Sequence, residues 1–214
     1  MTGMSSPTAG DVPAPADRPI GLAVLLVAAG ALGWWAAFRL TLEHLHALEH
    51  PGAVLGCDIS VLVQCGDALD SPQGSVFGFS NALLGVAFWV VPVIVGAAIL
   101  AGARFARWFW LPVWLGTAGA FAFVCWFVVQ SVFVLHALCP WCMLTWAVTI
   151  PMFLAVTVHV LRAGHLPAGA GVRRAAAHLM AWVPPATIVL YGVIVLVAQV
   201  RLGAVVNIWH TFFG

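Results

Sequence analysis

The chain has 214 residues, of which 63% are hydrophobic and only 7% are charged, and its formal net charge is +1. Soluble domains carry about 25% charged residues, so this composition excludes an ordinary soluble protein and predicts an integral membrane protein. The near-zero net charge also argues against nucleic acid as a partner.

The N-terminal residues 1–18 are polar and rich in Pro, Ala and Ser, which predicts a disordered tail. The apolar run that follows is too long for a signal peptide and lacks a convincing cleavage site, so we expect it to stay as a span. A bilayer core of about 30 Å needs about 20 apolar helical residues. Five segments qualify, at about 19–42, 81–101, 108–135, 139–161 and 182–202. Their continuous apolar character predicts helices, and so an all-α membrane protein.

Arginine is distributed unevenly between the connections. One side would hold the N-terminal tail and the linkers after the second and fourth spans, which carry Arg18, Arg104, Arg107, Arg162, Arg173 and Arg174. The other side would hold Arg39 and Arg201. Because positive residues gather on cytoplasmic loops, we expect a multi-pass protein of the cytoplasmic (inner) membrane with its N-terminus in the cytoplasm. The loop at 43–80 and the tail at 203–214 are then extracytoplasmic, where disulfides persist.

A Cys-Pro-Trp-Cys motif opens the fourth span with Cys139 and Cys142. The i, i+3 spacing places both sulfur atoms on one face of the first helical turn, within reach of a disulfide. Pro140 suits the first helical position, and the unpaired N–H groups and helix dipole there stabilise a thiolate, the reactive form in disulfide exchange. The motif therefore predicts a redox-active dithiol, with a structural disulfide as the alternative.

A second pair, Cys57 and Cys65, lies in the long polar loop, separated by an apolar stretch that can form a short amphipathic segment on the membrane. Alone, this pair is equally compatible with a structural staple, but a reactive pair on the same face favours a redox role. The Cys-x7-Cys spacing is unlike common zinc sites, and we expect no metal. We expect Cys125 to be a small packing residue within the third span. His136 either stabilises a nearby thiolate or caps an interface.

The histidines His44, His46 and His50 follow Glu43 at helix-like spacing. Metal binding is one interpretation, and a solvated helix end at the membrane interface is the favoured one.

The features, in their order along the chain, resemble the bacterial form of the vitamin K epoxide reductase (VKOR) family over about residues 20–200. The resemblance rests on the loop pair Cys57 and Cys65, a later Ser71, a Phe-Gly-Phe-Ser-Asn-x3-Gly stretch from Phe77 to Gly85, and the Cys-x-x-Cys that opens the fourth span. DsbB-type quinone reductases also have four redox cysteines, but their Cys-x-x-Cys precedes the loop pair.

The resemblance implies one transmembrane domain, 19–202, with a four-helix bundle around a quinone and a fifth, peripheral helix. It implies that Cys57 accepts electrons from a reduced partner and that Cys65 passes them to Cys139. Cys142 would face the quinone.

Three further residues match family positions at the quinone. Asn81 matches a family Asn that hydrogen-bonds the quinone carbonyl, and Ser71 would support the cap or the cysteine environment. Trp146 stands where vertebrate members have Tyr. Its indole N–H keeps a donor for a quinone, whereas the change puts epoxide chemistry in question.

We therefore expect a thiol:quinone oxidoreductase that reoxidises a DsbA-like thioredoxin-fold partner, reduces a menaquinone- or ubiquinone-type quinone, and so supports disulfide bond formation. Many bacterial members carry a fused thioredoxin-like domain. This chain ends at Gly214, so the expected partner is a separate protein. The alternatives are a quinone or quinone-epoxide reductase of the vitamin K-recycling type, and a non-catalytic membrane module held by structural disulfides.

Overall fold

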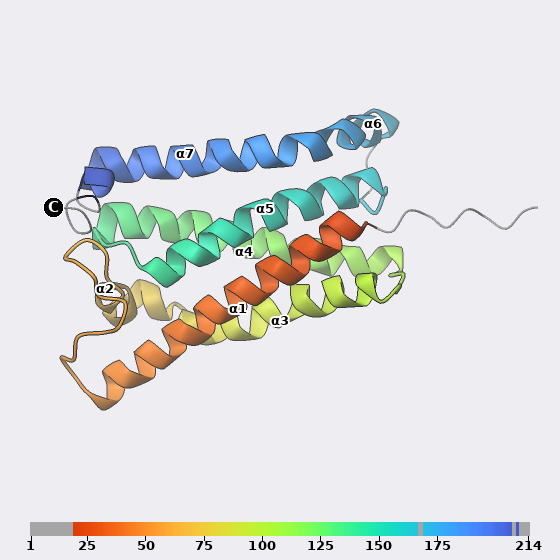
Figure 1. Cartoon of the computed structure of the whole chain (residues 1–214). Coiled ribbons are helices and arrows are strands. Elements are labelled where there is room, and N and C mark those ends of the chain that lie inside the picture. Colours follow the sequence, from red (N-terminus) through yellow and green to blue (C-terminus); the bar gives the residue numbers. More distant parts are fainter. Residues whose placement is uncertain (1–18, 167–168, 207–208, 210–214) are drawn as a thin grey trace, which may run out of the picture.

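The computed structural model describes residues 19–166, 169–206 and 209. The disordered tail expected at 1–18 lies outside these ranges, as does much of the tail expected at 203–214. Figure 1 shows long helices side by side: α1 (Ile20–Glu49), α3 (Asn81–Leu100), α4 (Trp110–Gln130, continued by the π-helical turn η3, Ser131–Leu135), α5 (Pro140–Arg162) and α7 (Val183–Leu202). The short helices are α2 (Gly66–Asp70) and α6 (Ala170–Leu179), with 3-10 turns η1 (Pro72–Ser75), η2 (Arg107–Phe109) and η4 (Met180–Trp182).

All five expected spans are present as helices that are long and apolar enough to cross a membrane, and the described residues contain no strand. The prediction of an all-α membrane fold is therefore confirmed. One boundary and one loop segment differ. α1 continues to Glu49, where the sequence predicted a loop from 43, and it ends just before Pro51, because a residue that precedes proline rarely stays helical. The apolar stretch 59–63 is not helical, and the short helix of the loop is α2 instead.

Glycine lets α1 and α3 approach each other closely. A Cβ atom on Gly33 would lie 2.3 Å from the Trp89 ring, and one on Gly96 would lie 2.6 Å from the carbonyl oxygen of Ala23. Close approach at small residues is the usual way for membrane helices to associate. α5 packs on both α1 and α4, so α1, α3, α4 and α5 form the bundle.

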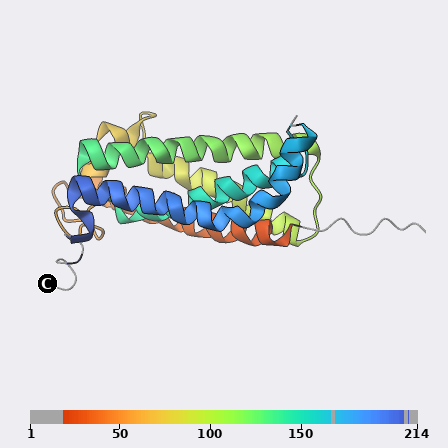
Figure 2. The ribbon, with the colours of Figure 1, turned by 90° about the horizontal axis from the view of Figure 1, so that it is seen from above.

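Helix α7 is peripheral, as expected. It lies beside α5 and away from α1 and α3 (Figures 1 and 2), and little of it is buried. The Tyr191 hydroxyl of α7 donates a hydrogen bond to the carbonyl oxygen of Ala147 in α5. Pro151 stands four residues after Ala147 and has no N–H to give that carbonyl. Tyr191 thus satisfies an acceptor that the proline leaves free, and attaches α7 to the bundle.

Candidate redox site

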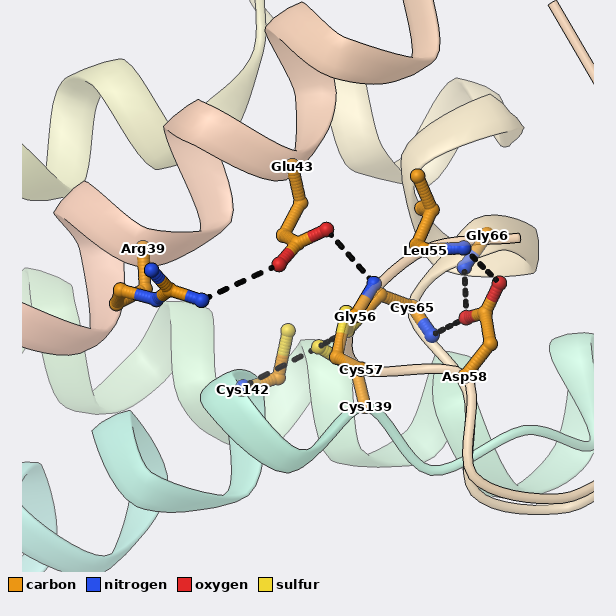
Figure 3. Close-up of a disulfide and its surroundings, with 10 residues drawn as sticks. All are labelled: Arg39, Glu43, Leu55, Gly56, Cys57, Asp58, Cys65, Gly66, Cys139 and Cys142. Atoms are coloured by element: carbon orange, nitrogen blue, oxygen red, sulfur yellow. Dashed lines mark hydrogen bonds and ion pairs between the residues drawn. A yellow bond between two sulfur atoms is a disulfide. The ribbon is translucent and has the colours of Figure 1, made fainter. Parts of the chain in front are cut away.

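The four predicted redox cysteines lie close together (Figure 3), at the end of the bundle that carries α2 (Figure 1). Cys57 and Cys65 form a disulfide, while Cys139 and Cys142 are free thiols, and all four are buried. The Sγ atom of Cys139 lies 3.5 Å from that of Cys65. The sequence placed both pairs at one surface, and the structure brings one member of each pair into contact.

Backbone hydrogen bonds hold the cysteine loop against the turn between η3 and α5. The N–H of Leu138 donates to the carbonyl of Leu62 at 2.8 Å, and the N–H of Gln64 donates to the carbonyl of Leu138 at 3.2 Å. Gln64 directly precedes Cys65, and Leu138 directly precedes Cys139. This short pairing of two segments therefore sets the two sulfur atoms next to each other.

Asp58 shapes the loop from inside. One carboxylate oxygen accepts the N–H of Cys65 at 2.8 Å and that of Gly66 at 3.2 Å, and the other accepts the N–H of Leu55 at 3.2 Å (Figure 3). One side chain thus joins both ends of the segment that the disulfide closes. Sequence reasoning missed this role, although an Asp directly after Cys57 is a residue type that often accepts nearby backbone N–H groups.

Glu43 fixes the loop to α1. It is buried, and its carboxylate accepts the N–H of Gly56 at 3.0 Å and pairs with Arg39 at 3.5 Å (Figure 3). Gly56 lies so close that an added Cβ would be 2.9 Å from the Glu43 carboxylate. Glu43 reaches the loop because α1 continues past its predicted end. Within the described residues, no three His, Cys, Asp or Glu side chains gather as a metal site requires.

Cys139 caps the N-terminus of α5, with Pro140 in the first turn, and its sulfur accepts the N–H of Cys142 at 3.4 Å. The hydrogen bond from the Cys142 side chain, with help from the N–H groups of Cys142 and Trp141, lowers the pKa of Cys139 below that of an ordinary thiol, against the opposing effect of burial. The lowered pKa favours Cys139 as the sulfur that is released as a thiolate in an exchange with Cys65.

A cavity of about 400 Å³ lies beside Cys142, between α1, α3, α4 and α5. Its walls are mostly apolar. Among its lining residues are Phe88, Trp89, Phe127, Trp141, Cys142 and Trp146. The indole N–H of Trp141 is buried and has no hydrogen-bond partner among the described residues, and the Arg39 guanidinium lies 5.7 Å from the centre of the ring. A volume of this size with few polar groups is typical of a site for an apolar ring compound.

The expected quinone residues do not all reach this cavity. Asn81 and Trp146 line it, and Ser71 is not among its lining residues. Asn81 donates to the carbonyl of Gln73 at 2.6 Å and accepts the N–H of Val76 at 3.2 Å, so it also ties η1 to α3. The hydroxyl of Ser71 donates to the carbonyl of Ala68 and accepts the N–H of Gly74, and thereby supports the loop between α2 and α3.

Two further residues considered from the sequence, Cys125 and His136, lie outside the contact between the cysteine pairs. Cys125 is exposed on α4, so the prediction of a packed core residue is wrong. Val124 and Phe127 turn inward from the same helix, and Cys125 projects to the other side. His136 adopts a left-handed conformation, with φ of 54°, where the chain turns from η3 towards α5.

Comparison with protein-family models finds a match to the vitamin K epoxide reductase family over residues 24–157. This range is more than half of the 214 residues, and it includes both cysteine pairs and every residue that lines the cavity. A comparison with curated proteins gives no match.

Proposed function

The chain belongs to the vitamin K epoxide reductase family and is thus a membrane oxidoreductase of a family that uses quinones; we propose that it is a thiol:quinone oxidoreductase that reoxidises a DsbA-like thioredoxin-fold protein. The observation that carries the proposal is the 3.5 Å separation between the sulfur atoms of Cys65 and Cys139. This contact links a disulfide in a polar loop to a dithiol beside an apolar cavity, which is the path that electrons need.

Electrons enter at the loop. A thiolate of the reduced partner attacks Cys57, the Cys57–Cys65 bond breaks, and Cys65 leaves as a thiolate. The second partner thiol then displaces Cys57, so the partner gains a disulfide and the loop pair holds two electrons. Cys57 is only 4% exposed, so the loop must open for this attack. The loop contacts of Asp58 and Glu43 therefore control the rate of partner access.

The second exchange passes the electrons inward. When Cys139 and Cys142 are joined, the Cys65 thiolate attacks Cys139, and Cys142 leaves as a thiolate. Cys57 then attacks Cys65, restores the loop disulfide and releases Cys139. The result is the state of Figure 3, with the loop pair oxidised and the helix pair reduced. Each exchange forms one S–S bond and breaks one, so no external oxidant is needed before the last step.

The cavity beside Cys142 suits a menaquinone- or ubiquinone-type ring. Its apolar walls and its volume match such a ring, and the unpartnered N–H of Trp141 offers a donor for a carbonyl oxygen. Trp146 and Asn81 line the same space and would help to hold the ring, while Ser71 supports the loop above it. When bound, a quinone supplies an acceptor for two electrons and two protons as the Cys139–Cys142 disulfide re-forms.

The distribution of Arg supports an extracytoplasmic position for the cysteines. Arg18 lies outside the described residues. The other five Arg that were predicted for the cytoplasmic side belong to the linkers at the end of the bundle that carries α6, opposite the cysteines (Figure 1). By the positive-inside rule this end faces the cytoplasm of an inner membrane, and the loop pair faces the compartment in which disulfides form.

A trapping experiment tests the proposal. In the variant Cys65→Ser, Cys57 is a free thiol without its internal partner, so we expect it to attack the disulfide of an oxidised thioredoxin-fold protein. This exchange forms a covalent, reductant-sensitive mixed disulfide with Cys57 and releases one thiol of the partner. Cys125→Ser is the matched control and should leave the relay unchanged, because Cys125 lies on the far face of α4. Disulfide formation that persists in both Cys57→Ser and Cys142→Ser would refute the relay. Turnover of a quinone epoxide in a purified assay would instead favour the epoxide reductase alternative.

A further inference from the structure

Within the described residues, five Arg lie at the end of the bundle opposite the cysteines, and no Asp or Glu lies there. The described Asp and Glu residues are Glu43, Glu49, Asp58, Asp67 and Asp70, all at the cysteine end. The ion pair found within the described residues, Arg39–Glu43, is also there. The opposite end carries Arg104, Arg107, Arg162, Arg173 and Arg174. Figures 1 and 2 both place α6 at that end. The described protein therefore has positive charge there without its own counter-charge.

Two of these Arg side chains converge on one buried residue, Gly164. An Nη atom of Arg107 donates a hydrogen bond to the Gly164 carbonyl oxygen. Arg173 of α6 also packs against Gly164, so closely that a Cβ atom on Gly164 would lie 3.1 Å from the guanidinium carbon of Arg173. Gly164 has φ of +68°, a conformation in which other residues are strained. Guanidinium groups carry five donors each, so both Arg keep donors for an anion placed beside Gly164.

His165 adds an unsatisfied polar atom next to this pair. Its Nδ1 is buried and has no hydrogen-bond partner among the described residues. Its ring stacks on that of Trp110, with 5.8 Å between the ring centroids. Burial, and then the charge of Arg107, lower the pKa of His165, so the ring is neutral near pH 7. Buried polar atoms without a partner are rare in proteins, and His165 directly follows Gly164 in the chain.

Aromatic residues place the same end at the membrane surface. Trp108 is 73% exposed and Trp182 is 65% exposed, each next to a linker that carries Arg. Exposed Trp favours the headgroup level of a bilayer. Helix α6 presents Arg173 together with the exposed apolar side chains of Val172 and Leu179, the combination found in helices that lie on a membrane. The guanidinium groups thus sit at headgroup depth.

We propose that Arg107 and Arg173 bind the phosphate of an anionic phospholipid headgroup beside Gly164. Arg binds phosphate through paired, charge-assisted hydrogen bonds, and an anion between the two guanidinium groups removes their mutual repulsion. The bound lipid joins three parts of the chain: η2 before α4, the end of α5, and α6. Because α6 leads into α7, the lipid holds the peripheral helix in place on the cytoplasm-facing side.

Lipid binding to the full-length protein tests the site without any measurement of redox activity. Affinity for phosphatidylglycerol and for phosphatidylcholine is measured by native mass spectrometry or by lipid-dependent shifts in Tm. A salt concentration of about 0.5 M screens diffuse surface charge, so the remaining preference reports a defined site. We expect preferential binding of phosphatidylglycerol, and a loss of about tenfold in its affinity for each of Arg107→Gln and Arg173→Gln.

The control is the double variant Arg104→Gln/Arg174→Gln, which removes two charges from the same end, twice as many as each site variant, at Arg residues other than the two that contact Gly164. It should keep the preference. The variant Arg107→Lys/Arg173→Lys keeps the charge but loses the paired donors, so we expect intermediate affinity, and an unchanged Tm in phosphatidylcholine shows that it is folded. Equal binding of both lipids, or equal losses in the control and the site variants, refutes the proposal. Full competition by inorganic phosphate at the same concentration as the lipid would overturn the assignment to a headgroup.

Discussion

Replacement of Asp58 by Asn should loosen the cysteine loop without unfolding the bundle. The carboxylate accepts the N–H groups of Leu55, Cys65 and Gly66. The amide has one oxygen and one NH2 group, so in either orientation at least one of these N–H groups faces a donor. Hydrogen bonds to charged groups contribute about 1.5–3 kcal/mol. A loss of about 2 kcal/mol corresponds to a roughly 30-fold increase in the fraction of open loop.

Hydrogen exchange of the full-length protein in micelles measures this opening directly. Amides of residues 55–66 should exchange about 30-fold faster in Asp58→Asn, while those of the membrane helices keep their wild-type rates. Asp70→Asn is the matched control, since Asp70 is exposed at the end of α2. Unchanged exchange in the loop, or equally faster exchange throughout the bundle, would show that Asp58 does not hold the loop locally. Faster opening should also expose Cys57, so its reaction with a dithiol partner should accelerate.

Three other outcomes follow from the structure. Tyr191→Phe removes the donor to the Ala147 carbonyl and should weaken the docking of α7 by about 1 kcal/mol, measured as a lower Tm in micelles; an unchanged Tm contradicts the attachment. Because the pKa of Cys139 is lowered, its thiolate should persist at a pH where ordinary thiols are protonated and disappear as the pH falls through that pKa; the ultraviolet absorbance of the reduced protein against Cys139→Ser checks this. Gly119→Leu places a side chain in open space at the cavity wall and should abolish saturable quinone reduction. The control Gly192→Leu on α7, also in open space, should leave quinone reduction unchanged. Equal effects of the two variants would place the quinone elsewhere.

The sequence predicted the spans well because a membrane helix is recognised from local properties. Each span must satisfy its backbone internally and present apolar side chains to lipid, so a continuous apolar run defines it. The end of α1 was missed because its last residues are in a polar stretch, where hydropathy no longer distinguishes helix from loop. The pair Pro51-Gly52 was the better signal there. Helix α6 was missed because a short, Arg-containing surface helix lacks the length of a span.

The four cysteines and their grouping into a loop pair and a helix pair came from the sequence, because residue type and spacing determine thiol chemistry. The contact between the pairs came only from the tertiary structure. Cys65 meets Cys139 because Leu62 and Gln64 pair with Leu138, more than 70 residues further along the chain. Hydrogen bonds between such distant segments leave no periodic pattern in either of them. The same holds for Arg107 and Arg173 at Gly164: local sequence determined which chemical groups the protein has, and long-range packing decided which of them meet.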